Sequence, residues 1–117
     1  MQYLPIFTKL DNKPVLIVGG GDVALRKAHA VLKARAKLTL IAPSFCDEIK
    51  ALEQEQKVIL VSDYFKADDV TGFMLVIAAT DNDTVNAAVH SAAEQRNIFV
   101  NVVDDQPKCS FIFPSIV

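Results

Sequence analysis

Three consecutive glycines form the segment of this sequence that is best suited to hold a ligand: Gly19, Gly20 and Gly21. They follow an apolar run at residues 14–18 and precede a stretch of helical periodicity at residues 22–34. With Ala24 they give the pattern G-x-G-x-x-A. Its first glycine permits a tight exit from a strand, its second lets the backbone approach a pyrophosphate, and its small last residue lets the helix pack closely on the sheet. Glycine turns are common, but one placed between a strand and a helix predicts a dinucleotide site.

The backbone amides of this turn are the groups expected to bind the anion. Those of Gly21, Asp22 and Val23 should point at the pyrophosphate, where the helix dipole also favours negative charge. Arg26 and Lys27 follow one turn later and could assist an anionic ligand. Neighbouring residues on a helix point in different directions, so at least one of the two is expected on a solvated face.

The end of the second expected strand departs from the usual dinucleotide pattern. An acidic residue normally stands there, about 20 residues after the glycines, and binds the ribose hydroxyls. Here the position holds Pro43 and Ser44. Only Ser44 could hydrogen-bond a ribose, and capping the next helix is an equally good role for it. No arginine stands there to meet a 2′-phosphate, so NAD is favoured over NADP.

Two later strand ends also carry polar residues. In an open α/β sheet, ligands bind outside the carboxyl ends of the strands. Thr80 and Asp81 follow the most apolar strand, where they could face the nicotinamide half of the cofactor or cap the next helix. Asp104 follows another apolar strand and could act as a general base beside a hydride acceptor. From position alone, an aspartate that only forms the turn is the more common case.

The elements that must position these residues alternate between strands and helices. Strands are expected at residues 14–18, 38–42, 58–61, 74–78 and 98–103, with a short sixth strand at 111–113. Helices are expected at residues 22–34, from Ser44 onward, and from about 80 to 95, the last with Val85, Ala88, Val89 and Ala92 facing inward. This alternation predicts an α/β, Rossmann-type three-layer fold with a mostly parallel twisted sheet, as one domain over residues 1–117.

Composition narrows the possible partners. The chain has 117 residues, of which 51% are apolar, and a net charge of −2 with interspersed signs, which excludes a basic nucleic-acid interface. The longest apolar run, residues 73–79, is far shorter than the roughly 20 residues needed to span a membrane. The N-terminus lacks the features of a signal peptide, so a cytoplasmic location is expected. Cys46 and Cys109 form no C-x-x-C and no ligand spacing with a histidine, so no metal site is expected.

Several stretches together resemble a known family. They are residues 4–7, the glycine turn with Arg26 and Lys27, residues 78–81, residues 101–104 and residues 110–115, in family order across nearly the whole chain. The chain is similar to the precorrin-2 dehydrogenase/sirohydrochlorin ferrochelatase family, which forms the N-terminal domain of siroheme synthases. The run at residues 101–115 is the specific part of this resemblance, since the glycine turn is generic.

The resemblance implies siroheme biosynthesis by two reactions at one site. Precorrin-2 loses a hydride to NAD and a proton to a base, giving sirohydrochlorin, and ferrous iron is then inserted as a substrate in a lyase step. Asp104 falls on the family's proposed base for both steps. The NAD contacts carry over to the glycine turn through Val23, to Pro43 and Ser44, and to Thr80 and Asp81.

The resemblance also implies what would surround this segment. Family members continue beyond the equivalent of residue 117 into a helical region that helps to form a homodimer and covers the tetrapyrrole, and some carry a methyltransferase domain after it. The segment alone is then expected to bind NAD and to turn over precorrin-2 poorly or not at all.

A second reading of the same sequence is a non-catalytic module that senses NAD. It shares the glycine turn, but it would not need Asp104 or the tail at residues 110–115. A third reading, a fold that binds S-adenosylmethionine, normally requires an acidic residue after the second strand, which is missing here.

Overall fold

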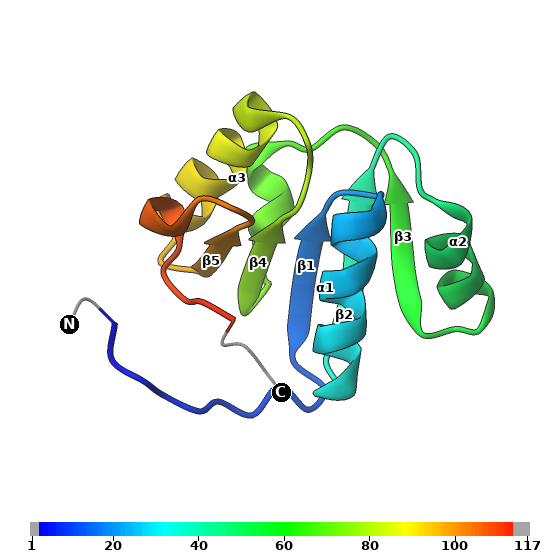
Figure 1. Ribbon diagram of the computed structural model, residues 1–117, viewed down its shortest axis with the longest axis horizontal. Coiled ribbons are helices and arrows are strands. Elements are labelled where there is room, and N and C mark those ends of the chain that lie inside the picture. Colours follow the sequence, from blue (N-terminus) through cyan, green and yellow to red (C-terminus); the bar gives the residue numbers. More distant parts are fainter. Residues whose placement is uncertain (1–2, 114–117) are drawn as a thin grey trace.

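A single five-stranded sheet forms the centre of the molecule (Figure 1). The computed structural model describes residues 3–113, except for the side chain of Gln106. The strands are β1 (Pro14–Val18), β2 (Lys37–Ala42), β3 (Val58–Ser62), β4 (Leu75–Ala78) and β5 (Phe99–Val102). They lie in the order β3-β2-β1-β4-β5, and all four neighbouring pairs are parallel. The predicted α/β fold class is confirmed, with a sheet that is wholly parallel.

Helices cover both faces of this sheet. Helices α1 (Asp22–Lys33) and α2 (Asp47–Gln54) pack on one face, and Figure 1 shows α1 in front of β1 and β2. The 3₁₀ helix η1 (Ala67–Val70) and helix α3 (Asp83–Gln95) pack on the other face. A second 3₁₀ helix, η2 (Gln106–Lys108), follows β5. None of the helices in the described part of the chain is long and apolar enough to cross a membrane.

The strands are buried on both faces because their side chains alternate between two cores. In β1, Val15 and Ile17 face α1 and α2, whereas Leu16 and Val18 face α3 and η1. All four are at most 2% exposed. Parallel strands covered by helices on both faces are expected to be continuous runs of this kind, which explains why the apolar runs predicted the strands well.

The register places the carboxyl ends of four strands at one edge of the sheet. The Gly19 N–H donates to the Ile41 carbonyl (2.9 Å), and the Ala79 N–H donates to the Val18 carbonyl (2.8 Å). The Val103 N–H donates to the Ala78 carbonyl (3.0 Å). These bonds extend the ladders just past the strand ends. The glycine turn and the segments after β2, β4 and β5 are thereby fixed next to one another.

The inward face of α3 differs from the prediction. Ala88 is exposed, and the buried positions are Asn86, Val89, Ala92 and Ala93. Val85 packs against the same core, so the predicted inward positions of Val85, Val89 and Ala92 are confirmed and that of Ala88 is wrong. A polar residue, Asn86, takes an inward position because it hydrogen-bonds the loop that precedes the helix.

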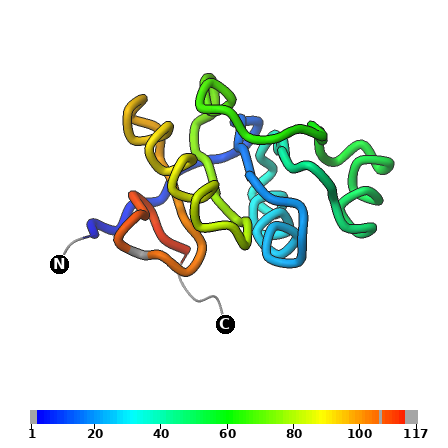
Figure 2. The backbone as a smooth tube through the Cα atoms, turned by 90° about the horizontal axis from the view of Figure 1, so that it is seen from above, coloured from blue at the N-terminus to red at the C-terminus, as the bar shows by residue number. Residues whose placement is uncertain are grey.

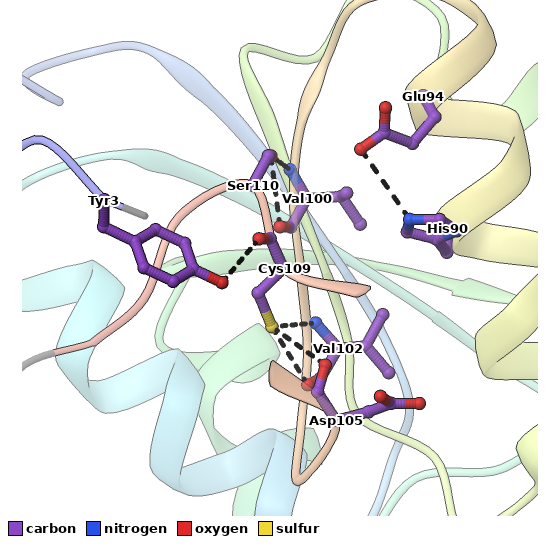
Figure 3. Close-up of polar contacts among 8 residues, drawn as sticks. All are labelled: Tyr3, His90, Glu94, Val100, Val102, Asp105, Cys109 and Ser110. Atoms are coloured by element: carbon purple, nitrogen blue, oxygen red, sulfur yellow. Dashed lines mark hydrogen bonds and ion pairs between the residues drawn. The ribbon is translucent and has the colours of Figure 1, made fainter. Parts of the chain in front are cut away.

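The short sixth strand expected at residues 111–113 is not formed. Ser110 instead closes the free edge of β5 with one backbone bond and one side-chain bond. Its N–H donates to the Val100 carbonyl (2.8 Å), while its hydroxyl accepts from the Val100 N–H (2.7 Å; Figure 3). Because a hydroxyl takes the place of a backbone carbonyl, no ladder propagates into the residues that follow.

Candidate functional site

The glycine turn joins the end of β1 to the start of α1, and its three glycines face different surroundings. Gly19 has a φ of 144°, and a Cβ added there would collide with the Ala79 carbonyl. A Cβ on Gly20 would collide with the Ser44 carbonyl and lie 3.1 Å from the Phe45 ring. A Cβ on Gly21 would meet nothing within 4 Å. Two glycines are thus required by packing, whereas the third faces open space.

The first turn of α1 carries backbone donors without acceptors in the helix. Gly21 is the N-cap, in an extended conformation, and it has no side chain with which to cap. The first α-type bond runs from the Leu25 N–H to the Gly21 carbonyl (2.9 Å). The N–H groups of Asp22, Val23 and Ala24 therefore remain available at the positive end of the helix dipole. Such an end is suited to an anion.

Pro43 and Ser44 lie at the same edge, directly after β2, and both are exposed. The prediction that Ser44 caps the next helix is wrong, since α2 begins at Asp47 with Cys46 as its N-cap. The Cys46 N–H donates to the Gly20 carbonyl (2.8 Å). This bond ties the chain to the glycine turn before the helix begins. It leaves the Ser44 side chain at the surface beside that turn.

Thr80 and Asp81 follow β4, and neither caps α3. The N-cap is Asn82, whose side chain accepts from the Val85 N–H (3.0 Å). The Thr80 hydroxyl accepts from the Asn82 N–H (3.1 Å), which closes a small turn. Asp81 is exposed at the tip of that turn. Capping of α3, the alternative role considered for Thr80 and Asp81, is therefore carried out by Asn82.

Asn86 holds this loop in place, although it was not among the predicted site residues. Its amide group donates to the Thr80 carbonyl (3.0 Å). Its side-chain oxygen accepts from the Thr80 hydroxyl (2.7 Å) and from the Thr80 N–H (3.3 Å). Asn86 is only 7% exposed, so these bonds are shielded from water. The apolar periodicity of the helix placed residues 85, 88, 89 and 92 inward, so it gave no signal for Asn86.

Asp104 lies in a tight loop that leaves β5. The Asp105 N–H donates to the Val102 carbonyl (3.1 Å), which places Asp104 inside a turn with a left-handed φ of 63°. Aspartate tolerates this conformation better than most residues. Its side chain is exposed, whereas Asp105 is paired with Lys108 (3.2 Å). The residue does form a turn, and its carboxylate is still free to face a ligand.

Cys109 closes the loop on its other side (Figure 3). Its sulfur accepts from the Val102 N–H (3.2 Å) and lies 3.3 Å from the Val102 carbonyl oxygen and 3.4 Å from that of Asp105. Partial burial raises the pKa of this thiol, and the Asp105 charge adds to the rise, while the Val102 hydrogen bond and the Lys27 charge oppose it. The loop is thus held by a protonated thiol.

The N-terminal segment supports the same loop from outside. The Tyr3 hydroxyl donates to the Cys109 carbonyl (3.1 Å), although the two residues lie at opposite ends of the chain. Figure 2 shows the N-terminal segment running beside the loop that follows β5. The two ends of the described chain therefore meet next to Asp104.

A hollow of about 420 Å³ opens between α1 and this loop. Its polar lining comes from Lys27, Asn101, Asp104, Asp105 and Cys109, and its apolar lining includes Ile112 and Phe113. The Asn101 side chain donates to the Phe111 carbonyl (2.9 Å), which holds the tail across the end of β5. Residues 114 and 115, part of the resemblance noted above, lie outside the described residues.

Lys27 faces this hollow, whereas Arg26 is exposed on α1. The expectation that at least one of the two lies on a solvated face is confirmed. The Lys27 ammonium lies 4.4 Å from the centroid of the Phe113 ring. Within the described part of the chain, no group of three or more His, Cys, Asp or Glu side chains is placed to hold a metal ion.

Comparison with protein families identifies the class of ligand. Residues 6–115 match the family described as "Putative NAD(P)-binding". This match confirms the expectation of a nicotinamide dinucleotide as cofactor and covers every candidate contact named above. The fold also resembles the solved structure of a precorrin-2 dehydrogenase, SirC, with a TM-score of 0.78 and 23% identity over 98% of this chain and 54% of that one.

Curated relatives extend well beyond this segment. A siroheme synthase of Pseudoalteromonas translucida (strain TAC 125) is 66% identical over all 117 residues, which make up 25% of its length. A siroheme synthase of Actinobacillus pleuropneumoniae serotype 3 (strain JL03) is 50% identical, again over the whole chain and 24% of its own length. The chain therefore spans about a quarter of the curated relatives that it matches. The resemblance stated from the sequence is confirmed.

Proposed function

Because the chain belongs to the NAD(P)-binding family and is homologous to the N-terminal quarter of siroheme synthases, we propose that it provides the NAD site and the general base of a precorrin-2 dehydrogenase. The observation that carries the proposal is the 66% sequence identity to a siroheme synthase over the whole chain. It is supported by the exposed carboxylate of Asp104, at the sheet edge that also bears the glycine turn. The wider role is siroheme biosynthesis.

The glycine turn fits a dinucleotide. The space in front of Gly21 and the free N–H groups of Asp22 and Val23 suit a pyrophosphate, which needs close approach of the backbone. At the same sheet edge, we propose that Pro43 and Ser44 contact the adenosine ribose and that Thr80 and Asp81 contact the nicotinamide half. NAD, when bound, accepts the hydride. NAD is preferred over NADP because an exposed serine, and no arginine, follows β2.

Asp104 is the proposed general base. Oxidation of precorrin-2 removes a hydride and a proton, and a carboxylate beside the hollow can take the proton. Its neighbour Asp105 is already paired with Lys108, which leaves Asp104 as the carboxylate with no ionic partner in the loop. The turn that holds it is fixed by backbone bonds and by Cys109, so the base is positioned before the substrate arrives.

Insertion of ferrous iron into sirohydrochlorin is the second proposed step. Iron is here a substrate, and two pyrrole N–H protons leave as it enters the ring. A proton acceptor at the edge of the hollow serves this step as well, so Asp104 is proposed for both. In the full-length protein we propose a homodimer, with residues beyond this domain covering the tetrapyrrole.

The test uses this chain in place of the N-terminal quarter of the Pseudoalteromonas translucida siroheme synthase, with the 117-residue chain assayed in parallel. Precorrin-2 and NAD are supplied, and sirohydrochlorin is followed by absorbance. We expect Asp104→Ala to abolish oxidation while the dissociation constant for NAD stays within about threefold. Asp11→Ala, which removes an exposed carboxylate just before β1, at the opposite edge of the sheet, is the control.

Two results would contradict the proposal. Unchanged turnover in Asp104→Ala would remove this residue from the mechanism. Tight NAD binding with no turnover in the chimera would favour the alternative, a module that senses NAD without catalysis.

A further inference from the structure

We propose that Lys27 receives a carboxylate of the ring substrate in the hollow beside Asp104, and that it thereby selects substrates by their acidic side chains. The inference rests on the proposed function, since it concerns the same site. It adds a specificity-determining residue in the middle of α1, the helix whose first turn is the expected dinucleotide site.

The position of Lys27 supports this role. Its side chain is half-buried and lines the hollow, whereas Arg26, the next basic residue on the helix, is exposed. Its ammonium rests 4.4 Å from the centre of the Phe113 ring. That ring is itself held by Phe111, at 5.6 Å between centroids. The charge is therefore fixed at the wall of the hollow.

The charges around the hollow leave Lys27 without a carboxylate. Of the two acidic residues that line it, Asp105 is paired with Lys108 at 3.2 Å. Asp104 makes no ion pair, and the ion pairs among residues 3–113 do not include Lys27. An aromatic face holds an ammonium more weakly than a carboxylate does. An acidic group that entered the hollow could thus take over this cation.

A substrate carboxylate would also need such a partner. Precorrin-2 and sirohydrochlorin carry acetate and propionate side chains, which Asp104 would repel if it were the only charge at the site. A fixed ammonium on the opposite wall offsets this repulsion. It also orients the ring, because one acidic side chain is held at Lys27 while the reacting carbon faces the base.

Phosphate oxygens of the dinucleotide are the other anions within the same active-site region. Lys27 stands five residues beyond Asp22, so its backbone lies about 7.5 Å along the helix from the first of the free amides and about 4.5 Å from the last, that of Ala24. Its ammonium contacts Phe113, in the tail beyond β5, and both residues line the hollow that Asp104 also lines. This placement favours the substrate over the pyrophosphate.

The experiment compares Lys27→Met and Lys27→Arg with Arg26→Met, the matched control on the adjacent exposed residue. Dissociation constants are measured on the chain for NAD, for uroporphyrin as an acidic tetrapyrrole, and for its methyl ester. Loss of one charge-assisted hydrogen bond should weaken uroporphyrin binding about tenfold or more in Lys27→Met. We expect NAD binding within about twofold of wild type, no effect on binding of the ester, and substantial recovery in Lys27→Arg.

The chimera described above gives a second measurement. In Lys27→Met we expect a higher KM for precorrin-2 and a smaller change in kcat. If the wild-type chimera is active and Lys27→Met changes neither KM nor uroporphyrin binding, the inference alone is wrong. A loss that appears in NAD binding instead would assign Lys27 to the phosphates and also overturn it. An inactive wild-type chimera that binds no tetrapyrrole would refute the proposed function itself, and this inference with it.

Discussion

Substituting alanine for two adjacent glycines should separate folding from cofactor binding. Gly20 and Gly21 differ by one position, yet a Cβ on Gly20 meets the Ser44 backbone and the Phe45 ring, whereas a Cβ on Gly21 meets open space. Gly20→Ala should therefore lower the free energy of unfolding, and Gly21→Ala should not. Gly21→Ala should instead weaken NAD binding, because the methyl group stands where a pyrophosphate must approach the backbone.

The magnitudes follow from the surroundings of each glycine. Overpacking a well-filled site costs about 1–3 kcal/mol, and the upper part of this range applies to Gly20 because a backbone carbonyl must move. Gly21 has a φ of −103°, which alanine adopts without strain. Alanine at this position should gain about 0.4–1 kcal/mol through the unfolded state, but it is a poorer N-cap than glycine by a similar amount, so the free energy of unfolding should stay close to that of wild type. The two variants should differ by about 2–3 kcal/mol, or on the order of 10 °C in Tm.

Urea unfolding followed by circular dichroism measures the first effect, and calorimetric titration with NAD measures the second. We expect Gly21→Ala to fold about as stably as wild type and to bind NAD about tenfold more weakly or worse, as loss of close backbone contact predicts. Gly21→Val extends the test with a larger side chain. Equal losses of stability in both alanine variants would show that a side chain on Gly21 meets other atoms of the protein and does not face open space. An unaltered NAD dissociation constant in Gly21→Val would refute the placement of the pyrophosphate.

Two further predictions concern the contacts that hold the neighbouring loops. Asn86→Ala should lower the free energy of unfolding by about 2 kcal/mol, since it leaves the Thr80 N–H and carbonyl without partners. The N-cap variant Asn82→Ala, measured in the same urea series, should lower it by about 1 kcal/mol. Equal losses in the two variants would show that burial of the Asn86 hydrogen bonds adds nothing to their contribution to stability. The raised pKa of Cys109 means that the folded state holds the thiol proton more tightly than the unfolded chain, so this contribution is complete below the ordinary thiol value of 9.0 and is lost as pH rises above it. Wild type should therefore lose more stability above that pH than Cys109→Ala, and parallel pH profiles would contradict the assignment.

The strands and the parallel sheet could be predicted because local and global signals agree. Buried parallel strands need continuous apolar runs, and the central strand β1 was predicted with its observed bounds, Pro14–Val18. The residues at which the helices begin were harder to predict from the sequence. The start of α2 is decided by the Cys46 bond to the Gly20 carbonyl, which joins segments far apart in the sequence. Ser44 is a good capping residue, but tertiary contact overrode its local preference.

The site was predictable where backbone geometry alone defines it. The glycine turn follows from spacing, and its open position at Gly21 agrees with the expected approach of a ligand. The hydrogen bonds of Asn86 and the contact of Lys27 with Phe113 could not be predicted in the same way. One depends on which face of α3 turns inward, and the other on where the tail places Phe113. Both contacts depend on tertiary packing, which the helix and strand propensities of neighbouring residues do not determine.

The tail after β5 links the stability of the sheet to the geometry of the site. An edge strand exposes backbone groups that must be covered, and here the side chains of Ser110 and Cys109 cover those of Val100 and Val102. The same contacts fix the loop that carries Asp104 and bring Phe113 to α1. A dinucleotide bound at the start of α1 would then stand at a fixed distance from the hollow, because one rigid helix bears both the free amides and Lys27. Changes that loosen the tail should therefore impair substrate binding before they impair NAD binding, since the glycine turn is held separately by β2 and β4.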